Sequence, residues 1–165
     1  MAVVDRKSTA LTNRDASPRV NNPPHLQGGT RLQARATFEL ANGDSIASIF
    51  RIAQLPTNAI VNRIKLFCDA ITSAAGDVGL YKTTDNGSAV VSVACYATAV
   101  SIASAVTVGT EIMFEAKDIA NIEKRVWEDA GLTSDPGGFL DLAMTLTAAA
   151  AAAGTLSFLV DYTVP

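Results

Sequence analysis

The chain has 165 residues and a mass of 17.2 kDa, of which 48% are hydrophobic, 18% charged and 6% aromatic. This length predicts one domain with a real core, and ordinary apolar content with a net charge of −3 excludes disorder throughout. The two cysteines, Cys68 and Cys95, can form at most one disulfide, which is too few to stabilise a chain of this length, so a disulfide scaffold is excluded. Both cysteines are predicted to be buried thiols in a reducing compartment.

The charge is divided unevenly along the chain. Residues 1–35 carry six basic and two acidic side chains, a net charge of +4, whereas the rest carry seven basic and fourteen acidic ones, a net charge of −7. A basic segment on an acidic body is typical of proteins that bind something negative. The alternative is a flexible, solvated tail whose positive charge has no functional role.

Residues 1–33 are predicted to form an N-terminal arm rather than a folded element. Proline, asparagine and glycine crowd this stretch without any hydrophobic period, and Asn22-Pro23-Pro24 favours polyproline-like geometry. The arm is therefore expected to be disordered, or to be extended and to order only against a partner. No apolar stretch follows Arg6-Lys7, so we expect no secretory signal and a cytosolic origin.

The body, residues 34–165, is predicted to consist mainly of strands. Turn signals at Asn42-Gly43-Asp44, at residues 55–58 and at Asp85-Asn86-Gly87-Ser88 separate segments with a period of two. The segments predicted as strands are residues 34–40, 46–52, 59–68, 78–82, 89–95, 139–147 and 155–164.

Alanine is unusually frequent, with 28 residues, and six of them form the run 148–153 between the last two strands. Alanine favours helix, but six residues are far fewer than the roughly 12–15 that an isolated helix needs. The run is therefore predicted to be the tip of a hairpin that pairs residues 139–147 with 155–164, and Gly154 to supply an unusual backbone angle. Its small side chains would let another chain approach closely.

One helix is predicted within residues 118–132, with Asp118 as its N-cap and Gly131 as its end. Its apolar face is expected to be core or interface rather than a cofactor platform, and comprises Ile119, Ile122, Val126, Trp127, Ala130 and Leu132. The uncharged residues 86–110 are long enough to span a bilayer, but their serine, threonine and glycine content favours a strand followed by a loop.

The motifs of common catalytic sites are absent from the sequence, including phosphate loops, dinucleotide fingerprints, zinc-protease helices and nucleophile elbows. The only histidine, His25, lies in the arm, so a Ser-His-Asp relay has no base in the body. The acidic groups within residues 111–118 and 123–129 are expected to be solvated rather than a glycosidase pair. We therefore expect no enzyme and no catalytic, cofactor or metal site.

Short strands with frequent turns predict a mainly β fold, a jelly-roll-like antiparallel sandwich with one short helix and the extended arm. Residues 34–164 also resemble the capsid decoration, or cement, proteins of tailed bacteriophages. The resemblance lies in residues 61–70, 76–87, 125–132, 135–138, 142–147 and 148–156. Such proteins bind the outside of the major capsid shell across its subunit junctions.

The resemblance implies a virion structural protein on the capsid surface, assembled in the host cytoplasm, whose partners are the major capsid protein and itself, as a homodimer or homotrimer. No small-molecule substrate, cofactor or membrane is expected, and direct nucleic-acid contact is disfavoured by the acidic body. The arm is expected to carry much of the docking through Arg6, Lys7, Arg14, Arg19, Arg31 and Arg35. A receptor- or carbohydrate-binding sandwich of a virion fibre and a small enzyme remain alternatives.

Overall fold

The computed structural model describes residues 6–22 and 27–164. His25 and the Pro23-Pro24 pair lie outside the described residues. Within the described residues the body contains eight strands: β1 (Thr30–Leu40), β2 (Ile49–Pro56), β3 (Ile60–Cys68), β4 (Ala75–Lys82), β5 (Val90–Ser101), β6 (Val106–Glu111), β7 (Phe139–Ala148) and β8 (Gly154–Val164).

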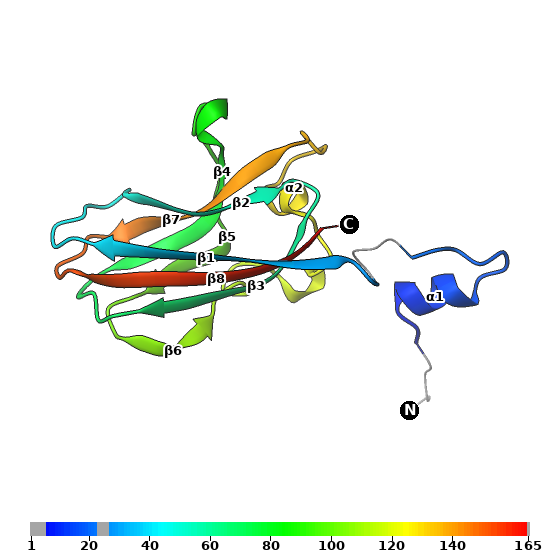
Figure 1. Ribbon diagram of the computed structural model, residues 1–165, viewed down its shortest axis with the longest axis horizontal. Coiled ribbons are helices and arrows are strands. Elements are labelled where there is room, and N and C mark those ends of the chain that lie inside the picture. The colour runs from blue at the N-terminus through cyan, green and yellow to red at the C-terminus, as the bar shows by residue number, and fades with distance from the viewer. Residues whose placement is uncertain (1–5, 23–26, 165) are drawn as a thin grey trace.

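Two four-stranded antiparallel sheets face each other, with the orders β1-β8-β3-β6 and β2-β7-β4-β5 (Figure 1). Successive strands lie in opposite sheets, except that β4 and β5 are neighbours. This is the order of an eight-stranded jelly roll, so the predicted fold class is confirmed.

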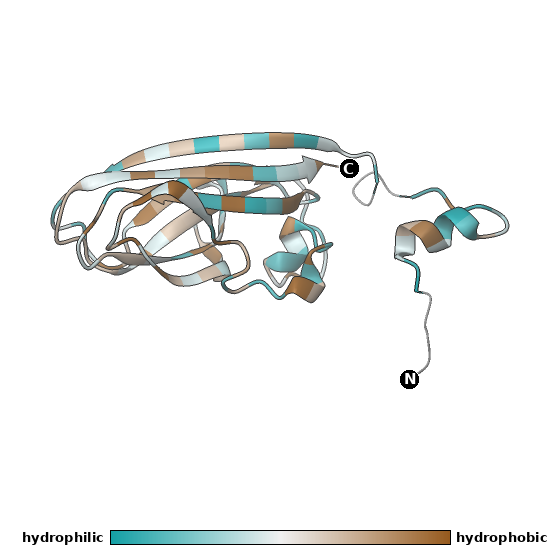
Figure 2. Ribbon diagram, turned by 90° about the horizontal axis from the view of Figure 1, so that it is seen from below, coloured by the Kyte–Doolittle hydropathy of each residue, from teal (hydrophilic) through white to brown (hydrophobic). Residues whose placement is uncertain are grey.

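The core lies between the two sheets. It forms because every second side chain along most of the strands points inward and is apolar. Hydrophobic and hydrophilic residues alternate along the long strands of the sandwich in Figure 2. Phe38 of β1 packs edge-on against Phe50 of β2 and Phe158 of β8, with ring centroids 5.6 and 6.4 Å away, which joins the two sheets. Most of the predicted inward side chains of the last two strands are buried, and only Tyr162 and Val164 are half-buried. The buried ones are Leu140, Leu142, Met144, Leu146, Leu156, Phe158 and Val160. Each contributes roughly 1.5–3 kcal/mol.

The predicted hairpin between the last two strands is wrong. β7 pairs with β2 and β4, whereas β8 pairs with β1 and β3, so the alanine run crosses from one sheet to the other. Ala150 is buried and its N–H donates to the carbonyl of Asp44, while the N–H of Ala151 donates to that of Thr72. Because alanine side chains are only methyl groups, the alanine run can pack closely against the loop that precedes β2 and the loop that precedes β4.

Gly154 is needed for space rather than for an unusual angle. Its backbone is not among those with positive φ, and a β-carbon there would lie 2.9 Å from Cγ1 of Ile71. The predicted role of Gly154 is therefore wrong, because the contact with the Ile71 side chain, and not the backbone angle, is what requires glycine.

The uncharged residues 86–110 form two strands rather than one. β5 extends to Ser101, and β6 follows after a short loop and pairs with β3, so the prediction of a single strand and a loop missed β6. Gly87, with φ of +89°, ends the predicted turn between β4 and β5. No helix within the described residues has the length and apolarity to cross a bilayer.

The predicted helix over residues 118–132 is two short turns, the 3-10 helix η2 (Ile119–Asn121) and α2 (Val126–Asp129). Asp118 caps η2 as predicted, because its side chain accepts from the N–H of Ala120. The helical conformation is interrupted between η2 and α2. At the start of α2 the N–H groups of Val126 and Trp127 donate instead to carbonyls of the β2–β3 loop. Ile119 and Ile122 are consequently exposed rather than core residues.

The N-terminal segment contains a helix that the sequence pattern does not predict, α1 (Thr9–Asp15), capped by the side chain of Ser8. The side chain of Asn22 closes the segment by donating to the Ala10 carbonyl and accepting from Asn13. Figure 1 shows α1 beyond the end of the sandwich, and none of its residues is buried. β1 begins at Thr30, so the sheet starts four residues before the predicted boundary at residue 34.

Candidate functional site

Most acidic side chains that sequence reasoning considered as catalytic candidates have local structural partners. Glu111 accepts from the N–H groups of Ile64 and Met113, and Glu128 accepts from that of Arg125. In the parts of the chain that the structure describes, no three His, Cys, Asp or Glu side chains gather as metal ligands. These carboxylates therefore hold loops and strand ends in place.

The two cysteines are free thiols, Cys68 buried and Cys95 partly buried. Burial, reinforced by the nearby charge of Asp129, raises the pKa of Cys95 to about 12. The thiolate is the reactive form of cysteine, so Cys95 stays protonated and unreactive at neutral pH.

A buried ion pair connects β5, the loop before η2, and α2. Nζ of Lys117 lies 2.7 Å from Oδ2 of Asp129, and only 2% and 3% of these side chains are exposed. The Tyr96 hydroxyl donates to the same carboxylate oxygen at 3.0 Å, and the Lys117 ammonium lies 5.7 Å from the centre of the Tyr96 ring. Burial raises the pKa of Asp129 even though Lys117 favours its ionised form. The group is enclosed and has no access to a substrate.

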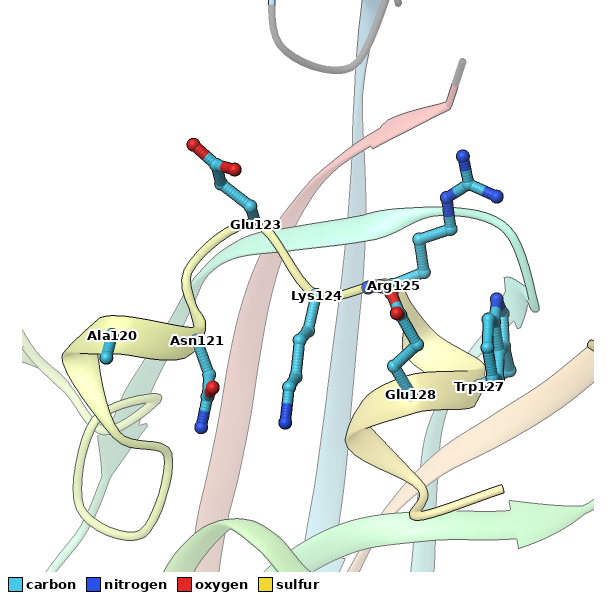
Figure 3. Close-up of a pocket in the computed structure, with 7 residues that line it drawn as sticks. All are labelled: Ala120, Asn121, Glu123, Lys124, Arg125, Trp127 and Glu128. Carbon is cyan, nitrogen blue, oxygen red and sulfur yellow. Dashed lines mark hydrogen bonds between the residues drawn. The ribbon is translucent and has the colours of Figure 1, made fainter. Parts of the chain in front are cut away.

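A surface hollow of about 390 Å³ lies along the segment that contains η2 and α2. In Figure 3 Asn121 and Lys124 point to one side of the segment, while Glu123 and Arg125 point to the other. Trp127 is half-buried beside them, and its Nε1 has no hydrogen-bond partner among the described residues. The lining of the hollow is mostly polar and charged, and Trp127 is its one aromatic side chain.

Four of the six predicted docking cations lie in residues 6–22, the part of the chain around α1, which we call the α1 segment. Lys7 and Arg14 both contact the carboxylate of Asp15, at 2.8 and 2.7 Å, and these hydrogen bonds lower its pKa to about 2. Arg6 and Arg19 are exposed. All of these groups are open to solvent, so their ion pairs are weak and can exchange for others.

The other two predicted cations, Arg31 and Arg35, belong to the sandwich. They lie on the outer face of β1, where Nη2 of Arg31 contacts Oδ2 of Asp161 on β8 at 2.9 Å and Nε of Arg35 donates to Gln33. The structure therefore does not bring the six residues together on one arm, because four precede the sheet and two form part of it.

Sequence reasoning missed two further cations on the same outer face, Arg63 and Lys65 of β3. Asn62 forms a bulge, so that Ile60 and Val61 are both buried before alternation resumes. From there Ile64 and Leu66 point inward, and Arg63 and Lys65 point outward. The period-two pattern around Ile64 could have revealed the outward pair.

No protein-family model and no curated protein sequence matches the chain. It is similar to a chain of the cyanophage Pam1 capsid asymmetric unit, with a TM-score of 0.53 and 18% identity, over 89% of this chain and 94% of the other. It is also similar to a chain of the capsid of Ralstonia phage GP4, with a TM-score of 0.56 and 15% identity, over 83% and 86% of the two chains. At these identities the chains share a fold.

Proposed function

We propose that the chain is a non-enzymatic virion structural protein that binds the outside of a phage capsid shell and stabilises it as a decoration, or cement, protein. The observation that carries this proposal is the jelly roll shared with chains of two phage capsids along most of their length. The local structural roles of the acidic residues support a protein that works through its surface.

A cement protein stabilises a shell by binding the assembled state, since any ligand that prefers one state shifts the equilibrium toward it. Many copies on one particle add avidity, so each contact can be weak. The proposed partners are the major capsid protein and further copies of this chain in a closed homodimer or homotrimer. In this proposal the protein is placed on the capsid surface after assembly in the host cytoplasm.

We propose that the N-terminal cations contribute to docking on the shell. The α1 segment exposes four of them next to a body whose balance is acidic, and no α1 residue is buried. Exposed Leu11 and Val20 add apolar surface that a partner can cover. Arg31 and Arg35 would contact the same partner from the sheet.

The test mixes the full chain with shells of the cognate major capsid protein that lack it, and measures bound copies after sedimentation. We expect saturable binding at a fixed number of copies per shell. Glutamine at Arg6, Lys7, Arg14 and Arg19 should weaken it, and so should removal of residues 1–29, which leaves β1 whole. No binding by the full chain contradicts the proposed function, whereas undiminished binding by both variants contradicts only the role of the N-terminal cations.

A further inference from the structure

Four of the nine lysines and arginines in residues 30–164 lie on the outer face of the β1-β8-β3-β6 sheet. In the strand register Lys65 lies opposite Leu159, which lies opposite Arg35 on β1, and Arg63 lies opposite Asp161, which lies opposite Gln33. Strands are about 4.8 Å apart, so β1 and β3 are separated by about 10 Å across β8. We call the surface formed by Arg31, Arg35, Arg63 and Lys65 the basic face.

The basic face departs from the charge balance of the sandwich as a whole. Its four cations are accompanied by the neighbouring carboxylates of Asp161 and Glu111, and Glu39 lies further along the same face of β1. Residues 30–164 contain nine lysines and arginines against fourteen aspartates and glutamates. A positive area on an otherwise acidic body selects an acidic partner and orients the molecule as it approaches.

The two carboxylates position the guanidinium groups without using all of their donors. Asp161 is almost fully buried and accepts from Arg31 and Gln33, while 62% of the Arg31 side chain stays exposed. Glu111 lies 3.5 Å from Nε of Arg63, whose side chain is 47% exposed. A guanidinium has five N–H donors in a planar fork that matches a carboxylate, so both groups can bind a second carboxylate from outside.

A hollow of about 370 Å³ lies between these two guanidinium groups. Asn62 and Thr163 complete its lining together with Arg31 and Arg63, and Nδ2 of Asn62 donates to Oγ1 of Thr163 at 2.7 Å. This polar, positively charged hollow has the size and the donors to receive an aspartate or glutamate side chain.

The outer face of the other sheet offers no comparable group. Its arginine, Arg51, is held by Asp141 at 2.6 Å and by the carbonyls of Lys82 and Ser88, and lies 5.5 Å from the centre of the Tyr81 ring. Only 29% of its side chain is exposed. The strong donors of Arg51 are therefore used within the molecule.

We infer that the basic face lies against the capsid shell and binds acidic side chains of the capsid subunits, an inference that rests on the proposed function. The cations of the α1 segment precede β1 in the chain, so both groups can meet one acidic surface. The β2-β7-β4-β5 sheet would then face away from the shell, which gives the sandwich a defined orientation on it.

The test compares two full-length variants with the same change in net charge. Arg63→Glu with Lys65→Glu reverses two cations of the basic face, and Lys82→Glu with Lys124→Glu reverses two exposed lysines elsewhere. We expect shell affinity to fall at least about tenfold for the first variant and to stay within about twofold for the second. The difference should shrink as salt rises. Arg63→Gln with Lys65→Gln removes the charge without repulsion and should show a smaller loss in a folded protein.

Each outcome assigns the failure to one claim. If the wild-type chain binds and the basic-face variants bind equally well, or the control loses as much, the orientation is wrong and the proposed function stands. If the basic-face variants lose self-association in sedimentation but keep their shell affinity per copy, the face contacts a second copy and the inference is overturned. If the wild-type chain does not bind at all, the proposed function falls and the inference falls with it.

Discussion

Replacing Lys117 by methionine should destabilise the sandwich strongly, because it leaves the carboxylate of Asp129 without its cation. The two side chains are almost fully buried and in contact at 2.7 Å. Removing one partner of a buried ion pair typically costs about 3–5 kcal/mol. Methionine nearly matches the length of the lysine stem, so the loss reports the uncompensated charge rather than a cavity.

Protonation of Asp129 limits this loss. Neutralising an aspartate whose unfolded pKa is about 3.9 costs roughly 4 kcal/mol at pH 7 and roughly 1.5 kcal/mol at pH 5, at about 1.36 kcal/mol per pH unit. Burial already raises the pKa of Asp129, and loss of Lys117 raises it further. The folded state then binds more protons than the unfolded state, so the stability of the variant should rise as pH falls from 7 toward 4.

The assay is urea unfolding at pH 7 and pH 5, followed by the fluorescence of Trp127, the single tryptophan. We expect a loss of about 3–4 kcal/mol at pH 7, or roughly 6–15 °C in Tm, and less than half of it at pH 5. Adding Asp129→Asn should restore most of it, and Lys124→Met, at an exposed lysine, should change little. A loss below about 1 kcal/mol at pH 7, or an equal loss at both pH values, would refute this reasoning.

Two further predictions concern the outer faces of the sheets. Gly79→Ala should cost at least about 3 kcal/mol or prevent folding, because a β-carbon there would overlap the backbone of Ser92 and Val93; a Tm within a few degrees of wild type would contradict it. Asp161→Asn should cost about 1–3 kcal/mol at neutral pH, since its new NH2 group replaces one of the two oxygens and faces the donors of either Arg31 or Gln33. Burial raises the pKa of Asp161, but the hydrogen bonds from Gln33 and Arg31 outweigh it, so the pKa is lowered. Its stabilisation is complete above the unfolded value and is lost as pH falls below about 3.9. The variant should therefore lose less stability on acidification between pH 5 and pH 2 than wild type does, and parallel acid curves would contradict this.

The strands with a clean period of two could be predicted from the sequence because each turns one apolar face to the core. Phe139–Ala148 and Gly154–Val164 are such strands, and most of their buried side chains were predicted correctly, although Ala143 and Asp161 are buried on the faces that were predicted to point outward. Sheet order could not be predicted in the same way. A short link of small residues fits a hairpin as well as a crossing between sheets, and only the loops that meet Ala150 and Ala151 decide between them.

Residues 118–132 show how contacts far apart in sequence override a local pattern. Their apolar spacing suits one helix, but hydrogen bonds from Val126 and Trp127 to the β2–β3 loop set where α2 begins. The helix α1 was missed for a different reason, since it has no buried face and thus no apolar period.

The candidate docking surface was predicted only in part. Counting charge along the chain identified Arg31 and Arg35, but Arg63 and Lys65 lie about thirty residues later and join them only through the pairing of β8 with both β1 and β3. A shared surface formed by non-adjacent strands depends on sheet order, which the local sequence pattern does not contain.

The most direct test of the central claim is the thermal stability of the shell itself. Shells of the cognate major capsid protein are heated with and without saturating amounts of this chain, and the loss of intact particles is followed by light scattering. Binding to the assembled state predicts a higher disruption temperature that rises with the concentration of the chain until the sites are full. Particles that bind the chain at a fixed number of copies and yet break at the same temperature as bare shells would contradict a cementing role.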